Sequence, residues 1–385
     1  MDKKEKIEYL EGIRGLGAVM VMMSHFMVGF YPALYSGNVA EIHTVNGIEL
    51  AIVKSPLNII YGGNFAVCIF FILSGYVLTY KYFKTYEQSI IIASASKRYL
   101  RLLLPVAFSV LFSYILMRFS LYYNQQAAIL SNSNWWLSSF WTFEPKLLNA
   151  LKDSVWGVFF NGDWAYNNVL WTMVYEFKGS FLVFMIAILF GRLKNRFIIY
   201  SIIICFFINT YYCAFIIGLT LCDLHTRRGM DSYKLKGKIS VMLIFIIGLF
   251  LGSYPPGIQT QGTIYEILNI SIINDKMMFY HIIGATFIII ALLNSRSMQI
   301  FFSTRLMKKL GELSFSIYVI HLPIIGSVSS YIFINLPSNI TYFSRFIIMI
   351  ILSIITIFIA SECITKYIDK SGVKIANYVY EKYLE

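Results

Sequence analysis

Long apolar segments recur from one end of this 385-residue chain to the other, and no other feature limits its fold so strongly. About 20 apolar residues in a helix cross a hydrocarbon core about 30 Å thick. Helices suit that environment because they satisfy their own backbone hydrogen bonds. Charged residues make up 14% of the sequence, whereas an ordinary soluble domain carries about 25%. The pattern predicts an all-α, polytopic integral membrane protein with about ten transmembrane helices.

The apolar segments set the expected boundaries. The fifth to eighth are short for a bilayer, so we expect their ends to differ by several residues. We expect residues 1–385 to form a single membrane domain with a short cytoplasmic tail at 363–385 and no appended extracellular domain. The predicted spans are 13–30, 59–80, 99–121, 170–190, 196–209, 211–224, 239–253, 280–293, 313–334 and 343–362.

The distribution of positive charge predicts the orientation. With the N-terminus inside, most of the 32 Lys and Arg residues fall in inner segments, including the basic loops 225–238 and 295–312. This asymmetry is typical of cytoplasmic loops and favours both termini in the cytoplasm. The net charge of +12 is then mainly topological, and we expect no nucleic-acid partner. The outer segments hold only Lys54, Lys146, Lys152, Lys276 and Arg345.

Two outer segments are unusually long, at 31–58 and 122–169. The second contains NSNWWLSSFWTF and is rich in aromatic residues and Asn. Aromatic residues at a membrane interface often serve only as anchors. A long loop is also frequently functional, and aromatic rings stack well on sugar faces. Interface anchoring and a lid or platform for an acceptor both remain open.

Arg14 and His25 lie eleven residues apart on the first apolar segment. Eleven residues are about three helical turns, so both side chains share one face about 16 Å apart. Ionisable groups are costly inside a membrane and usually face a protein interior or a functional site. The five cysteines show no metal-binding spacing, and no nucleotide-binding fingerprint is present. We therefore expect structural thiols and no metal.

His25 and Glu176 are predicted to lie at similar depths. His25 is roughly 20 Å from the cytoplasmic face, and Glu176 is roughly 9 Å below the outer face. A carboxylate paired with an imidazole would fix its tautomer and stabilise the imidazolium. Histidine also suits removal of a proton from a hydroxyl. His25 is thus a candidate general base, and the alternative is a buried histidine hydrogen-bonded to a neighbouring helix.

Five sequence islands, taken in order, resemble the membrane acyltransferase-3 family, whose members O-acylate bacterial surface carbohydrates and some small molecules. Tyr76 replaces the more usual Phe in the second island, and Thr172 and Tyr175 are looser matches in the fourth. The islands cover half of the predicted spans and are specific to the family but not to a substrate. They are YLEGIRGLGAVMVMMSH, FFILSGYVL, KRYLRLLLP, LWTMVYEF and LSFSIYVIHLPI.

The resemblance implies a cytoplasmic acyl-CoA donor, commonly acetyl-CoA. Arg98 and Arg101 lie three residues apart on one helix face, where they could clamp its phosphates or only anchor the helix. Arg14 could line the channel for the donor or pair with a buried acid. His321, roughly 12 Å deep, could orient the thioester, close the channel, or only pack helices. The expected site therefore comprises His25, Glu176 and Arg14 for catalysis, with Arg98, Arg101 and His321 for the donor.

The expected function is an integral membrane O-acetyltransferase in the bacterial plasma (inner) membrane. Its acceptor would be a hydroxyl of a cell-surface glycan or of its lipid-linked precursor, with glycan-assembly proteins as candidate partners. This acceptor class rests on family analogy. A transporter or flippase of lipid-linked glycans, and an acyltransferase for a small metabolite, are the alternatives. Direct attack on the thioester and an acyl-histidine relay both remain open.

Overall fold

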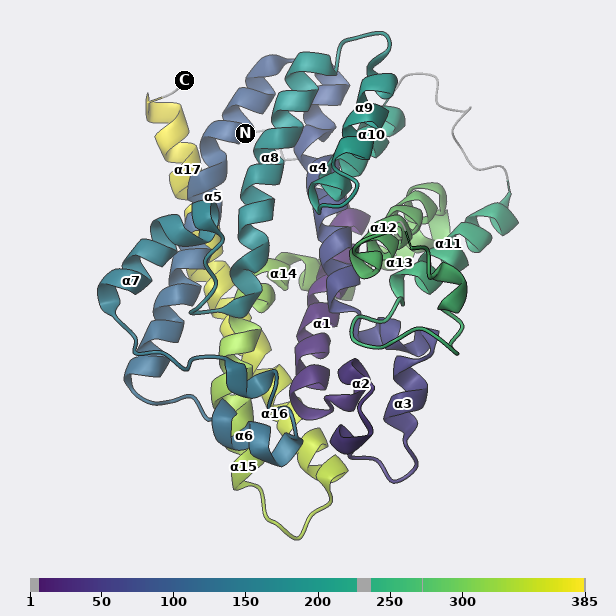
Figure 1. Cartoon of the computed structure of the whole chain (residues 1–385). Helices are drawn as coiled ribbons and strands as arrows, with labels where there is room; N and C mark the ends of the chain where they lie inside the picture. Colours follow the sequence, from purple (N-terminus) through teal and green to yellow (C-terminus); the bar gives the residue numbers. More distant parts are fainter. Residues whose placement is uncertain (1–6, 227–236, 272, 384–385) are drawn as a thin grey trace.

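Helices form nearly all of the regular structure in the computed structural model, which describes residues 7–226, 237–271 and 273–383. No β-strand occurs within these ranges. The long helices gather into one bundle (Figure 1). They are α1 (Glu8–Phe30), α4 (Gly63–Thr85), α5 (Gln88–Arg118), α8 (Trp171–Phe190), α12 (Lys276–Asn294), α14 (Arg305–Ile324) and α16 (Tyr342–Ile364). The prediction of an all-α polytopic protein is confirmed.

Each of the ten predicted spans coincides with a helix. In the described part of the chain, seven helical stretches are long and apolar enough to cross a membrane. Two of these continue through π-helical turns, from α14 into α15 (Ser330–Asn335) and from α16 into α17 (Lys370–Tyr383). Most of the predicted basic loop 225–238 lies outside the described residues.

Three of the ten helices are too short to cross a bilayer when straight. They are 11, 15 and 15 residues long, and at 1.5 Å per residue the shortest spans about 16 Å. By contrast α12, which follows them, has 19 residues and is longer than its predicted span. The three short helices are α9 (Arg196–Phe206), α10 (Tyr212–Thr226) and α11 (Lys238–Gly252).

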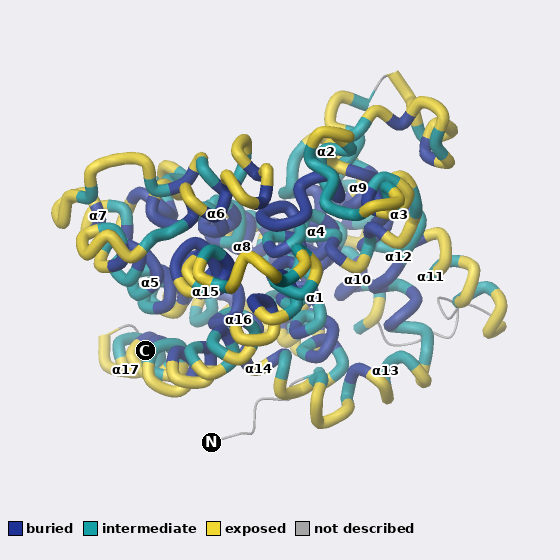
Figure 2. Tube along the Cα trace, turned by 90° about the horizontal axis from the view of Figure 1, so that it is seen from below, coloured by how far each residue is buried: buried dark blue, intermediate teal, exposed yellow. Residues whose placement is uncertain are grey.

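The bundle has two distinct ends. One carries α17, and we refer to it as the α17 end; the opposite one, the α15 end, carries most of the short helices of the long loops, whereas α7 lies at the side of the bundle (Figure 1). The buried residues gather along the middle of the bundle, whereas α7, α11 and α17 lie at its edge (Figure 2). The loop helices are α2 (Ala33–Ser36), α3 (Ile48–Val53), α6 (Asn124–Ser131) and α7 (Leu147–Lys152).

Glycines bring α1 into backbone contact with α14. A Cβ atom added to Gly15 would overlap the backbone nitrogen of Gly311, and one added to Gly311 would overlap the carbonyl oxygen of Glu11. Small residues at helix contacts are a common packing device in membranes, because lipid offers no hydrophobic driving force between helices. The EGIRGLGA segment therefore determines which helix lies beside α1.

A similar contact joins α4 to α10. A Cβ on Gly75 would overlap the carbonyl oxygen of Phe215, and one on Gly218 would overlap that of Ile72. Gly75 thus has the packing role expected for a small residue in this segment. The adjacent Ser74 does more than pack, because its hydroxyl points to another helix.

Candidate functional site

His25 on α1 and His321 on α14 lie in direct contact. Nδ1 of His25 is 2.7 Å from Nε2 of His321, and the two rings meet edge to edge in nearly one plane, with centroids 5.0 Å apart and planes inclined by 18°. His321 is completely buried, whereas His25 keeps partial exposure. Each histidine lies ten residues after a glycine of the α1–α14 contact. The close packing of these helices therefore brings both imidazoles to one depth.

The hydrogen bonds of this pair determine its tautomers. Nδ1 of His321 lies 2.9 Å from the carbonyl oxygen of Ile317, which can only accept a hydrogen bond. His321 therefore carries its proton on Nδ1 and offers a lone pair on Nε2. Nδ1–H of His25 donates to that lone pair. His25 is left with an unprotonated Nε2, which is the state that a general base requires.

Trp136 packs against the ring of His25. Their centroids are 5.5 Å apart, with the two planes inclined by 15°. Trp136 belongs to the long segment between α5 and α8 and also packs edge-on against Phe140. A residue of the aromatic loop thus reaches the histidine pair, an observation that favours the platform interpretation over simple interface anchoring. Its neighbour Trp135 remains 46% exposed.

Glu176 does not pair with His25, so the expected carboxylate–imidazole contact is wrong. On α8, Glu176 instead accepts hydrogen bonds from the Arg98 guanidinium and from Ser74 Oγ, the latter at 2.6 Å. Ser180, one turn further along α8, accepts from Nε of Arg98 at 2.8 Å. Two residues predicted at one depth can lie on different sides of a helical bundle, and the depth prediction carries no information on that direction.

The Arg98–Glu176 pair is almost fully removed from solvent. The exposed fractions of the two side chains are 7% and 15%. A buried ion pair requires good geometry and further hydrogen bonds to offset desolvation, and Ser74 and Ser180 supply them. Arg98 is thus held by Glu176, and of the two arginines in the possible phosphate clamp only Arg101 has an exposed side chain.

Arg101 and Arg14 retain more freedom. The side chain of Arg101 is exposed, and that of Arg14 is 37% exposed with only a loose 3.9 Å contact to Glu11. Arg14, Arg98 and Arg101 lie close enough for their charges to repel one another. Arg14 therefore belongs with the arginine cluster and not with the histidine pair, from which about 16 Å of helix separates it.

Tyr318 lies between the histidine pair and the buried ion pair. Its ring is 6.1 Å from that of His321, and its hydroxyl bonds to Thr172 at 2.7 Å and donates to the Val169 carbonyl at 2.9 Å. Thr172 is one turn before Glu176 on α8. Tyr318 therefore connects α14 to the helix that carries the carboxylate.

Sequence reasoning did not identify the partners that complete these contacts. Trp136 was one of several aromatic residues in its loop, with no spacing that distinguished it. Ser180 lies four residues after Glu176 and so shares its helical face, a signal that could have been used. Among the described residues, no group of three His, Cys, Asp or Glu side chains is placed to hold a metal ion.

Comparison with known proteins identifies the family to which this chain belongs. A family model described as an acyltransferase domain (acyltransferase-3) matches residues 7–362. The chain is also similar to the O-acetyltransferase PaAT-1 of Phomopsis amygdali, at 23% identity over 98% of this chain and 85% of that protein. No solved structure matches it.

Proposed function

We propose that this chain, a member of the membrane acyltransferase-3 family and an O-acyltransferase, takes an acetyl group from cytoplasmic acetyl-CoA. The acceptor is a hydroxyl of a cell-surface glycan or of its lipid-linked precursor, at a bacterial plasma membrane. The observation that carries the proposal is the His25–His321 pair, because it leaves a neutral imidazole with a free Nε2 beside an aromatic loop.

His25 acts as general base in this mechanism. Its Nε2 takes the proton of the acceptor hydroxyl while the hydroxyl oxygen attacks the thioester carbonyl carbon. The resulting imidazolium is stabilised through Nδ1–H by the lone pair of His321 Nε2. When the carbon–sulfur bond breaks, the CoA thiolate receives the proton from His25. The acyl ester and free CoA are the only products.

The arginine cluster is the proposed binding site for the donor phosphates. Arginine matches phosphate oxygens with two parallel hydrogen bonds and keeps its charge. Arg101 and Arg14 are the members with exposed side chains. Arg98 contributes its charge but stays held by Glu176, so we assign it and Glu176 a positioning role.

The aromatic loop is the proposed platform for the acceptor. Trp136 stacks on His25, and a sugar ring held against this loop would place a hydroxyl near Nε2. Separate glycan-assembly proteins would supply or remove the acceptor.

A covalent route uses the same residues. The free Nε2 of His25 could attack the thioester itself, form an acyl-imidazole and pass the acyl group to the acceptor. Incubation with acetyl-[¹⁴C]CoA in the absence of acceptor separates the two routes. Label bound to His25 supports the relay, whereas its absence together with full transfer supports direct attack.

Release of free CoA from acetyl-CoA tests the proposal. Purified protein in nanodiscs is given acetyl-CoA and a surface-glycan preparation, and thiol release is compared between wild type and His25→Gln. Glutamine keeps an amide donor for His321 but has no basic nitrogen. We expect acceptor-dependent CoA release by wild type and almost none by the variant. Equal release by both proteins would overturn the assignment of His25, and glycan movement without thioester consumption would favour transport.

A further inference from the structure

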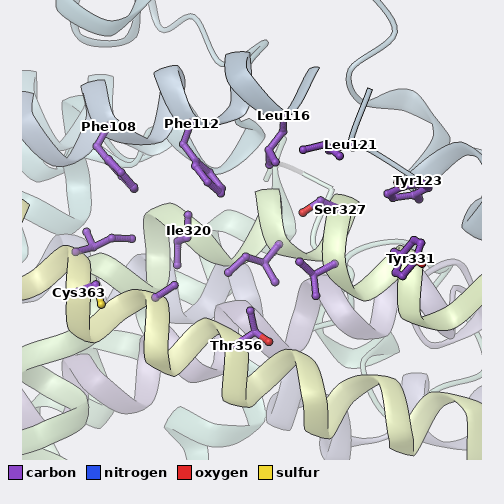
Figure 3. A pocket seen from close by; sticks show the side chains of 14 residues that line it. Phe108, Phe112, Leu116, Leu121, Tyr123, Ile320, Ser327, Tyr331, Thr356 and Cys363 are labelled. Carbon is purple, nitrogen blue, oxygen red and sulfur yellow. The ribbon is translucent and has the colours of Figure 1, made fainter. Parts of the chain in front are cut away.

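A groove of about 560 Å³ lies between α5, the α14–α15 stretch and α16 (Figure 3). Its volume falls within the roughly 300–1,000 Å³ typical of small-molecule sites. All three walls come from helical stretches long and apolar enough to cross a membrane. The lining includes Phe108, Phe112, Ile320, Tyr331, Thr356 and Cys363. A groove with such walls suits a hydrocarbon occupant.

The Ser and Thr hydroxyls in its wall are already satisfied. The Ser327 hydroxyl donates to the Pro323 carbonyl at 2.6 Å, and that of Thr356 donates to the Leu352 carbonyl at 2.8 Å. Each bond stays within its own helical stretch, so neither hydroxyl needs a polar ligand. A hydrocarbon chain fits such a wall without leaving a buried polar group unpaired.

One end of the groove reaches the aromatic loop. Tyr123 and Tyr331 form this mouth, with ring centroids 5.0 Å apart. The adjacent residue Tyr122 stacks on Trp141 at 3.8 Å, and Trp141 packs against Gly326, which directly precedes the groove residue Ser327. The mouth is thus continuous with the proposed acceptor platform.

The aromatic contacts continue from this mouth to the histidine pair. Trp141 lies 5.6 Å from Phe140 between ring centroids, and Phe140 lies 4.9 Å from Trp136. Trp136 in turn stacks on His25. A molecule whose tail occupies the groove would therefore hold its head group beside the loop that covers the reacting imidazole.

We infer that the groove binds the hydrocarbon tail of a lipid-anchored acceptor. This inference rests on the proposed function and selects the membrane-anchored form of the acceptor over a free glycan. Binding of the tail confines the reacting hydroxyl to the space near the mouth. This confinement raises the effective concentration of the acceptor.

Two cysteines allow a test on the unmodified chain. Cys363 lines the groove and is exposed, whereas the exposed Cys205 lies on α9 outside it. The protein in nanodiscs is treated with N-ethylmaleimide, with dodecyl β-D-glucoside as the probe and methyl β-D-glucoside as its tail-free match. At about ten times its dissociation constant, the bound probe should slow Cys363 labelling about tenfold. Cys205 should label at an unchanged rate, and methyl glucoside should protect neither thiol.

Variants that fill the groove provide a second test of the inference. Ala360→Phe and Thr356→Phe each place a ring in the groove, and Ile359→Phe adds one at a neighbouring position that is 62% exposed and outside the lining. The two filling variants should lower kcat/KM for acetylation of dodecyl glucoside about tenfold. They should leave the rate with methyl glucoside unchanged, and Ile359→Phe should leave both rates unchanged. Two positions are substituted so that the test can still be read if one of the variants fails to fold.

The outcomes separate this inference from the proposed function. Protection of Cys363 by added phospholipid as strongly as by dodecyl glucoside would mean that bulk lipid fills the groove, and would overturn the inference. Equal rates of the filling variants with both glucosides would also overturn it. Protection of Cys363 with no CoA release from wild type would leave a lipid site and contradict the proposed reaction instead.

Discussion

The two histidines should tolerate substitution differently, because only His25 exchanges a proton with the acceptor. His25→Gln should lower kcat by about 10²–10⁴, the range for loss of a general base. His321→Ala should lower it by about 10–100-fold, as expected for an orienting partner. His321→Gln should recover much of that loss, because its amide oxygen can accept from Nδ1–H of His25. Initial rates of CoA release check this order, and equal losses in all three variants would contradict it.

The buried ion pair should matter more for stability than an exposed one. Arg98→Met or Glu176→Gln leaves a charged or polar partner buried, and each should lower the free energy of unfolding by about 3–5 kcal/mol. The double variant Arg98→Met/Glu176→Leu should recover most of the lost free energy of unfolding, because it leaves no unpaired charge. Thermal and denaturant unfolding in detergent measure both effects.

The control for this comparison is Lys309→Met. It breaks a 2.7 Å contact with Glu362 in which both side chains are about half exposed, and such pairs contribute about 0–1 kcal/mol. A buried pair that costs no more than this control would mean that Arg98 and Glu176 are not held as the structure describes.

At the residue scale, sequence patterns identified the ionisable groups but not their pairing. Helical rise places His25 and Glu176 at similar depths, and it contains no information on direction around the bundle. His321 was assigned to the donor because its partner was unknown. The equal spacing from Gly15 to His25 and from Gly311 to His321 could have suggested the pair. That spacing becomes informative only once the two glycines are known to touch.

At the element scale, the α1–α14 contact should control the geometry of the histidine pair. Gly15→Ala adds a Cβ that overlaps Gly311, so the helices must separate at this contact, ten residues before each histidine, and the change in crossing shifts the histidines relative to one another. A shift of about 1 Å in a reacting group can cost about 10²-fold in rate. Gly372→Ala on α17 is the matched control, because its nearest neighbour would be 3.5 Å away. Initial rates and folded yield together check this, and an unchanged rate in Gly15→Ala would contradict it.

The aromatic loop makes a separate prediction. Trp136→Ala removes the ring that stacks on His25 and should raise KM for the acceptor up to about tenfold, within the range of aromatic stacking energies. KM for acetyl-CoA should stay the same. Trp135→Ala, at the exposed neighbouring position, should change neither constant. A selective rise in the KM for acetyl-CoA would instead place Trp136 in the donor path.

Element positions were more predictable than element lengths. Apolar runs located a helix at each of the ten predicted spans, because burial and lipid contact both require apolar residues. The short helices α9–α11 could not be distinguished from full spans, since their neighbours determine how deep they reach. The long loops also contain helices such as α6 and α7, which form on the surface of the bundle and lack a long apolar run.

At the scale of the whole molecule, the proposed reaction joins a donor at the α17 end to an alcohol at the α15 end. The arginine cluster lies toward the first end and the aromatic loop covers the second, with the histidine pair between them. The positive-inside pattern predicts that the α17 end is cytoplasmic. The orientation stays a prediction of the sequence, whereas the packing among α1, α5, α8 and α14 emerges only from the folded structure.

Transfer across a sealed membrane tests this claim most directly. Uniformly oriented proteoliposomes carry acetyl-[¹⁴C]CoA on the side of the α17 end and a long-chain alkyl oligosaccharide, added from the opposite side, as acceptor. The account predicts that label appears on the oligosaccharide without leakage of CoA, and that His25→Gln prevents it. Transfer only when donor and acceptor share one side, or undiminished transfer by His25→Gln, would contradict the account.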